Sequence, residues 1–195
     1  MAFIIYSLPL SRTAWLTHYL NYPLARPPQV VSHDTAPLCG NVKDFVKAYK
    51  DGLWGSVELA GVIGWQVIRE ELPNLKTVVV RRPVQDVYSS IVKLNLEPDL
   101  DKLIEVNEIL DVVAAQPGVH SVAFGALDTP AMCKWLFEYC LELEFDFDWW
   151  QHVAALNIQI DIEAFMRNKS VFDTKHSAYR TDVLERMKGV ASCLN

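Results

Sequence analysis

Four short runs of hydrophobic residues, mostly β-branched or aromatic, occur in the first two thirds of the chain. They are FIIYS (3–7), QVVSH (29–33), TVVVR (77–81) and HSVAF (120–124). Each run is nearly continuous rather than alternating, which is typical of strands that are buried on both faces in a parallel sheet. We therefore predict that the four runs are interior strands of one sheet.

Segments with helical character separate these runs. Residues 42–49 and 56–72 lie between the second and third runs, and residues 84–94 and 100–116 lie between the third and fourth. In the segment 100–116, leucine, isoleucine and valine recur at helical spacing. Three more helical segments follow the last run, at residues 130–143, 148–156 and 179–192, and Asp148 is expected to cap the second of them.

This order predicts an α/β fold with three α/β/α layers around a central parallel sheet of four or five strands, followed by a helical C-terminal region. We expect a single domain over residues 1–195. Its α/β core would span residues 1–125, and a helical extension would span residues 126–195.

Composition narrows the possible partners. The formal charge of −6 opposes broad binding to nucleic acid. The four cysteines form no CxxC pair, so we expect reduced thiols, a cytoplasmic protein and no bound metal. Cys133 and Cys140 are seven residues apart on a predicted helix and should share its core face.

No hydrophobic run is long enough for a membrane span, so we expect no membrane partner. The apolar C-terminal helices could support a homodimer.

Ligands of open α/β sheets bind beyond the carboxyl ends of the strands. The first such loop reads SLPLSRT, with Ser11, Arg12 and Thr13 at the expected start of a helix, where backbone N–H groups attract anions. The plainer alternative is that Ser11 caps the helix and Arg12 is a solvated charge. The first glycine is Gly40, so the loop lacks the glycine–lysine motif of magnesium-dependent phosphoryl transfer, which disfavours a kinase-like enzyme.

The second loop of interest follows the third predicted strand, in VVVRRPVQDVYSSI (78–91). Two arginines leave the carboxyl end of this strand directly before a proline that suits the first turn of a helix. Buried guanidinium groups need anionic partners, because leaving a buried charge unpaired is costly. A surface ion pair with one of the many carboxylates is the ordinary alternative.

Together, the two loops resemble the sulfotransferases that use 3′-phosphoadenosine 5′-phosphosulfate (PAPS). That family carries a pattern close to P-K-S-G-T-x-W after its first strand. It also carries an arginine at a later strand end, with a serine eight residues on. The second pattern matches Arg81 and Ser89, with Pro83 and Asp86 between them. The first matches seven consecutive residues: Pro9, Leu10, Ser11, Arg12, Thr13, Ala14 and Trp15.

The resemblance is specific over residues 3–20 and 76–92. It implies a fold like that of P-loop NTPases, PAPS as the cofactor and transfer of its sulfuryl group to a hydroxyl or amine of a small acceptor, without a metal. It further implies that Ser11, Arg12, Thr13 and the backbone amides of this loop hold the 5′-phosphosulfate. Trp15 would stack on adenine, and Arg81 and Ser89 would bind the 3′-phosphate.

Two departures from the family pattern bear on activity. The family lysine is Leu10 here, and the C-terminal R-K-G-x-x-G-D-W segment is missing. Arg12 could replace the lysine as the cation on the departing group. Removal of such an electrostatic donor costs about 100- to 1,000-fold in rate. An inactive relative that binds the nucleotide as a binding module is therefore the alternative function.

A general base that removes the proton from the acceptor's hydroxyl or amine would assist transfer of the sulfuryl group. His33, followed by Asp34, ends the second predicted strand at the same edge of the sheet as the first loop. We predict His33 as the catalytic base and Arg12 as the catalytic cation. The alternatives are that His33 only packs at the strand end, or that Glu58 is the base in a loop folded over the site.

Overall fold

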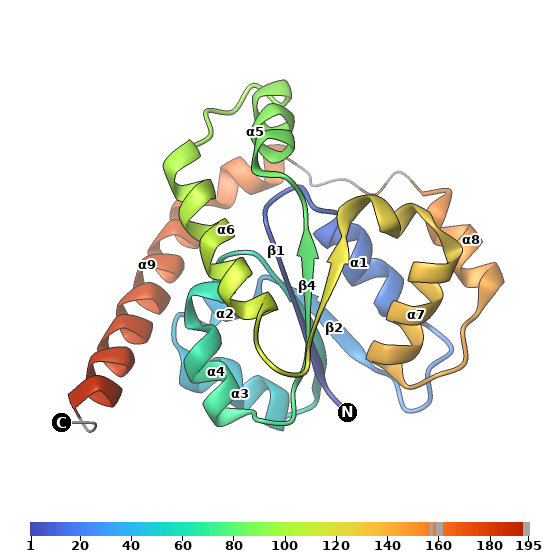
Figure 1. Cartoon of the computed structure of the whole chain (residues 1–195), viewed down its shortest axis with the longest axis horizontal. Helices are drawn as coiled ribbons and strands as arrows, with labels where there is room; N and C mark the ends of the chain where they lie inside the picture. The colour runs from blue at the N-terminus through green and yellow to red at the C-terminus, as the bar shows by residue number, and fades with distance from the viewer. Residues whose placement is uncertain (157, 159–161, 193–195) are drawn as a thin grey trace.

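The computed structural model describes residues 1–156, 158 and 162–192, and its centre is one parallel sheet. The sheet has five strands in the order β2-β3-β1-β4-β5. Helices cover both faces of the sheet (Figure 1), which confirms the predicted three-layer α/β/α fold. The strands are β1 (Phe3–Ser7), β2 (Val30–His33), β3 (Leu53–Glu58), β4 (Lys76–Arg81) and β5 (Val119–Ala123).

Alternate residues of β1 build the two hydrophobic cores. Phe3 and Ile5 point to the face covered by α1 (Thr13–Leu20), α7 (Pro130–Leu141) and α8 (Phe147–Ala154). Ile4 and Tyr6 point to the opposite face. That face is covered by α2 (Thr35–Cys39), α3 (Val42–Lys50), the 3-10 helix η1 (Ala60–Gly64), α4 (Trp65–Glu71), α5 (Val84–Lys93), α6 (Leu100–Ala114) and α9 (Ile162–Ser192). A short 3-10 helix, η2 (Phe124–Asp128), connects β5 to α7.

Strand β3 corrects the prediction of a helix over residues 56–72, because its residues up to Glu58 are extended. Gly55 lies directly opposite Phe3 in the parallel register. A Cβ atom at Gly55 would come within 2.2 Å of the Phe3 ring, so this strand needs a glycine at that position. A short apolar run fits a strand or a helix equally well, which is why the sequence alone did not reveal β3.

Two helix boundaries in the C-terminal region also differ from the prediction. Helix α8 is capped by Asp146 rather than Asp148, and the Asp146 carboxylate accepts a hydrogen bond from the Trp149 N–H at 2.8 Å. Helix α9 begins at Ile162, well before the predicted start at residue 179. Cys133 and Cys140 are buried on the inner face of α7, as predicted.

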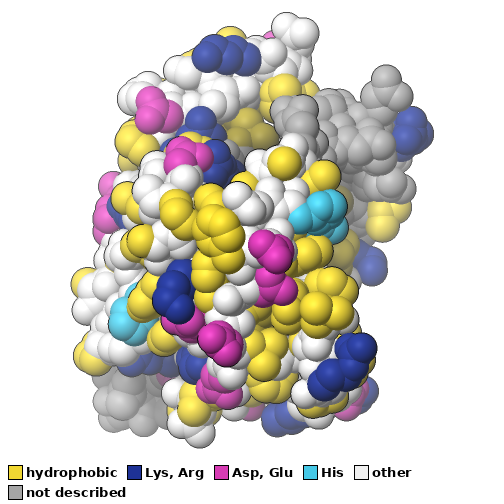
Figure 2. Space-filling view, turned by 90° about the vertical axis from the view of Figure 1, so that its right-hand side faces the viewer, with side chains coloured by type: hydrophobic (Ala, Val, Ile, Leu, Met, Phe, Trp, Pro, Cys, Tyr) yellow, Lys and Arg dark blue, Asp and Glu magenta, His cyan; other side chains and the backbone are white. Residues whose placement is uncertain are grey.

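The outer side of α7 and α8 carries hydrophobic side chains interspersed with charged ones (Figure 2). A homodimer through these helices stays a prediction. Among the residues that the structure describes, no helix combines the length and the hydrophobicity needed to cross a membrane.

The connections of β1 and β4 leave these neighbouring strands toward opposite faces of the sheet. From β1 the chain runs into α1 on one face, and from β4 it runs into α5 on the other (Figure 1). A crevice forms where adjacent strands diverge in this way, and ligands of open α/β sheets bind there. The topology therefore places the two predicted anion-binding loops next to each other.

Candidate functional site

The loop between β1 and α1 has an unusual backbone. Leu10 and Arg12 have φ angles of 55° and 62°, in the left-handed region that favours glycine. Each such residue costs about 1–2 kcal/mol, and strained residues of this kind cluster at functional sites. Arg12 is the N-cap residue of α1, and no side chain caps this helix. The loop therefore reaches its sharp turn without glycine, at the expense of backbone strain.

The predicted hydroxyl donors of this loop point inward. Ser11 and Thr13 are buried, and the Ser11 hydroxyl donates to the backbone oxygen of Pro9 at 3.4 Å. Arg12 is different, because about a third of its side chain is exposed. In this conformation the loop presents the Arg12 guanidinium group to solvent, and not the two hydroxyls.

Arg12 reaches across to the end of the sheet next to β5. Its guanidinium group donates to the backbone oxygen of Leu127 at 3.2 Å and forms an ion pair with the Asp128 carboxylate. The same group lies 5.5 Å from the centre of the Phe124 ring and 5.9 Å from that of Trp15. Asp128 is 62% exposed, so an anionic ligand could replace it with little loss of stability.

Arg82 brings the loop after β4 to the same place. Its guanidinium group donates to the backbone oxygen of Leu10 and to the Ser90 hydroxyl, the latter at 2.7 Å. It lies 4.4 Å from the centre of the Phe124 ring, which Arg12 also contacts. Burial lowers the pKa of Arg82; Asp86 opposes this shift, and the nearby positive charge of Arg12 adds to it. Two guanidinium groups thus share one aromatic ring beyond the carboxyl ends of β1 and β4.

The predicted pair of Arg81 and Ser89 is placed differently. Arg81 forms an ion pair with Asp111 of α6, and Ser89 is exposed on α5. Within the described part of the chain, no hydrogen bond or shared ring joins Arg81 to the first loop, although the prediction placed Arg12 and Arg81 at the two ends of one nucleotide. Arg82 and Ser90, also eight residues apart, are the pair in contact with the first loop.

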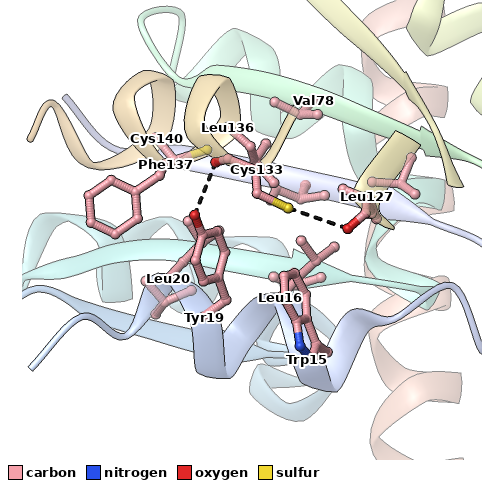
Figure 3. Packing of buried hydrophobic residues seen from close by; sticks show 14 of the residues in the cluster. Trp15, Leu16, Tyr19, Leu20, Val78, Leu127, Cys133, Leu136, Phe137 and Cys140 are labelled. Atoms are coloured by element: carbon pink, nitrogen blue, oxygen red, sulfur yellow. Dashed lines mark hydrogen bonds between the residues drawn. The ribbon is translucent and has the colours of Figure 1, made fainter. Parts of the chain in front are cut away.

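Trp15, predicted to stack on adenine, lies in the hydrophobic core between α1 and α7 (Figure 3). It is 7% exposed, and its ring stacks on Tyr19 with centres 4.9 Å apart. Its indole N–H donates to the backbone oxygen of Val153 in α8 at 3.1 Å. An adenine could reach this ring only if α8 moved.

His33 ends β2, at the predicted edge of the sheet but two strands away from β1. Its Nδ1 lies 3.6 Å from the Asp34 carboxylate. Asp34 has a left-handed φ of 49° and accepts a hydrogen bond from the Leu59 N–H at 2.7 Å. Burial raises the pKa of Asp34, and the charge of His33 partly offsets that shift.

Glu58 is fully buried at the end of β3 rather than in a loop over the site. Its carboxylate accepts hydrogen bonds from the N–H groups of Thr35 and Ala36, at 2.9 and 3.2 Å, and from the Ser56 hydroxyl. Burial, followed by repulsion from Asp34, raises the pKa of Glu58 to about 8. Glu58 and Asp34 therefore form a buried acidic pair that fixes the start of α2 and the turn after β3.

Several buried polar atoms at this edge have no hydrogen-bond partner among the residues that the structure describes. They are the Ser7 hydroxyl at the end of β1, Nε2 of His33, Nη1 of Arg81 and Nε of Arg82. Such atoms are rare in folded proteins, and each one calls for an explanation such as a bound ligand or water. Two of them, the Ser7 hydroxyl and Nε of Arg82, are donors at the adjacent ends of β1 and β4, which suits an anion.

The chain was compared with protein-family models, curated proteins and solved structures. No protein-family model matches the chain, no curated protein matches it, and no solved structure matches it.

The two predicted loops lie side by side, but some of the residues that meet there were not among those predicted. Arg82 and Ser90 have the same eight-residue separation as Arg81 and Ser89, so spacing alone could not choose between the two pairs. Phe124 and Asp128, both near the end of β5, carried no motif that could have indicated their contact with Arg12.

Proposed function

We propose that this protein binds PAPS at the crevice between β1 and β4 and transfers its sulfuryl group to a hydroxyl or amine of a small acceptor. The observation that carries the proposal is the meeting of Arg12 and Arg82 against the ring of Phe124. The two arginines come from the segments that resemble the two phosphate-binding motifs of PAPS-dependent sulfotransferases.

The proposed roles follow from position in the two loops. Arg12, at the start of α1, holds the 5′-phosphosulfate in place of the family lysine. Arg82 and Ser90 bind the 3′-phosphate, a role that the sequence had given to Arg81 and Ser89. A guanidinium group binds phosphate through paired, charge-assisted hydrogen bonds, which suits both positions.

The transfer itself requires no change of oxidation state. The acceptor's oxygen or nitrogen forms a bond to sulfur, while the bond from sulfur to the 5′-phosphate oxygen breaks. That oxygen keeps the electron pair, so negative charge develops near Arg12, and 3′-phosphoadenosine 5′-phosphate (PAP) leaves. The acceptor's proton passes to a base.

We propose His33 as that base, with Asp34 orienting its ring across the 3.6 Å between them. Strand β3 lies between β2, which His33 ends, and β1. The acceptor must therefore extend across the end of β3 to contact both His33 and the phosphosulfate beside Arg12. His33→Asn should lower turnover without changing nucleotide affinity. Loss of nucleotide binding in this variant would instead assign His33 to the nucleotide site.

A binding module without catalysis is the second candidate function. Leu10 stands where the family has its catalytic lysine, and Arg12 already pairs with Asp128. Sulfate transfer by the natural sequence, lost in Arg12→Ala, would exclude this candidate. Gain of transfer only in Leu10→Lys would favour it.

Calorimetric titration with PAP, AMP and ATP tests the nucleotide assignment. A phosphate held by a charged hydrogen bond contributes about 1.5–3 kcal/mol, so PAP should bind roughly 10- to 100-fold more tightly than AMP. Equal affinities for PAP and AMP would reject the 3′-phosphate site. Tighter, magnesium-dependent binding of ATP would point to a kinase-like protein.

A further inference from the structure

A separate pocket of about 720 Å³ lies between α6 and α9, on the face of the sheet opposite α1. Helix α9 packs against α2, α3, α4 and η1, whereas α6 packs against α5, η1, β4 and β5. The two helices therefore leave a space between their facing sides, with η1 and the start of α4 along it. This volume is in the range of pockets that hold small molecules, about 300–1,000 Å³.

Hydrophobic side chains from both helices form the walls of this pocket. Val106, Ile109 and Val112 come from α6, and Leu184 and Met187 come from α9. Val112 is 51% exposed, Leu184 48% and Met187 39%, although all three face the pocket. An apolar ligand would remove this hydrophobic surface from water, which is the main source of affinity in such pockets.

The end of the pocket at the carboxyl edge of the sheet is acidic. Asp34 lines it and is 7% exposed, and one of its oxygens accepts a hydrogen bond from the Leu59 N–H. Burial and repulsion from Asp34 raise the pKa of the nearby Glu58 to about 8, so Glu58 is mostly protonated at pH 7 and Asp34 is the acidic group of this end. Burial, followed by the charge of Arg180, lowers the pKa of His176, which also lines the pocket, so protonation of this histidine is disfavoured.

The other charged residues of the lining cancel one another. Lys102 and Arg180 contribute two positive charges, and Glu105 and Glu108 contribute two negative ones. All four are exposed. The field inside the pocket is therefore set mainly by the buried Asp34 at its end, because exposed charges are screened by solvent.

We infer that this pocket binds an amphiphilic primary amine. The ammonium group donates hydrogen bonds to the Asp34 carboxylate, and the hydrocarbon body lies along the apolar walls of α6 and α9. An ammonium group pairs with the buried Asp34 carboxylate, whereas a carboxylate group would be repelled by it. The inference concerns binding alone and does not rest on the proposed nucleotide site, although Pro9 of the β1–α1 loop also lines the acidic end.

Titration of the full chain with octylamine, 1-octanol and octanoate tests this inference, because the three probes share a chain length and differ in the head group. We expect the amine to bind most tightly, roughly 10-fold or more above octanoate, with the alcohol between them. Binding of none of the three, or preference for octanoate, overturns the inference.

Two variants separate the head group from the hydrocarbon body. Asp34→Asn keeps an oxygen for the Leu59 N–H and should bring the amine to within about 3-fold of the alcohol. Its matched control is Asp111→Asn, because Asp111 also lies on α6 but pairs with Arg81. This variant should leave the order of the three affinities unchanged. A preference for the amine that persists in Asp34→Asn contradicts the assigned role of Asp34.

Leu184→Gln tests the apolar wall at an exposed position that should tolerate the change. The substitution should lower the affinity for each of the three probes by a similar factor, about 3- to 10-fold. Unchanged affinities would place the ligand elsewhere. If Asp34→Asn does not fold, the order of the three affinities in the natural sequence still decides the question.

Discussion

The two halves of the carboxyl edge of the sheet carry ionisable groups of opposite kind, basic in one half and acidic in the other, and hold them in different ways. On the β1–β4 half, the guanidinium groups of Arg12 and Arg82 are partly exposed and contact backbone oxygens, a serine hydroxyl and an exposed aspartate. On the β2–β3 half, Glu58 and Asp34 are buried and accept hydrogen bonds from backbone N–H groups.

This difference indicates what each half does. Buried acids whose partners are backbone N–H groups of the next turn are part of the architecture, since nothing else can satisfy those groups. Partly exposed arginines can exchange an aspartate or a hydroxyl for a ligand at little cost. We therefore expect changes at Glu58 and the residues packed on it to affect mainly stability, and changes at Arg12 or Arg82 to affect mainly nucleotide binding.

The largest effect is expected from Gly61→Ala in the acidic half. A Cβ atom at Gly61 would lie 2.5 Å from a Glu58 carboxylate oxygen and 2.9 Å from the Ala36 Cβ, both fully buried. Overpacking of this kind costs about 3 kcal/mol of the free energy of unfolding. Urea denaturation measures this loss. The matched control is Gly125→Ala, where no atom lies within 4 Å of the added Cβ. Equal stability of the two variants would show that the residues around Glu58 can move to accommodate the added methyl group.

The second effect is a dependence of stability on pH that comes from Glu58. Its pKa is about 8 in the folded protein against an ordinary value of 4.5, so the folded state binds the proton more tightly than the unfolded state. Stability is therefore highest below about pH 4.5 as far as this group is concerned, and it falls as pH rises toward about 8. We expect a loss of about 3 kcal/mol between about pH 5 and pH 8.

Glu58→Gln removes this titration while keeping an oxygen for the N–H groups of Thr35 and Ala36. The variant should show a flatter dependence of the urea midpoint on pH over the same interval. A slope equal to that of the natural sequence would assign the effect to another group, with Asp34 the first to test.

A smaller effect is expected from Trp15→Phe in the basic half. This variant loses the hydrogen bond from the indole N–H to the Val153 oxygen and part of the stacking on Tyr19, which together cost about 1 kcal/mol. PAP affinity, measured by calorimetry, should stay the same, because this ring is packed in the core. A large loss of affinity with unchanged stability would restore the predicted role of Trp15 in stacking on adenine.

The layers of the fold could be predicted from sequence because continuous apolar runs alternate with helical segments. Strand β3 could not be predicted, because its apolar run continues without a break into η1 and α4. The need for a glycine at Gly55 becomes clear only when the register places Phe3 opposite it. The start of α8 was predicted two residues late, because Asp146 and Asp148 are equally good caps by type.

The loops at the candidate site could also be predicted, but the partners of the side chains could not. Arg81 and Arg82 are adjacent, and only the direction of each side chain at the end of β4 decides which one meets Leu10 and which one meets Asp111. The buried acidic pair was equally hidden, because Asp34 and Glu58 are far apart in sequence and adjoin only through the strand order.

The most direct test of the central claim compares PAP affinity in Arg82→Ala and Arg81→Ala by calorimetric titration. Both variants remove one positive charge from the end of β4, so the difference between them reports position rather than net charge. If the anion site lies where Arg12 and Arg82 meet, Arg82→Ala should weaken PAP binding by about 10- to 100-fold, and Arg81→Ala should change it by less than about 3-fold. The reverse order, or no loss in either variant, would contradict the account.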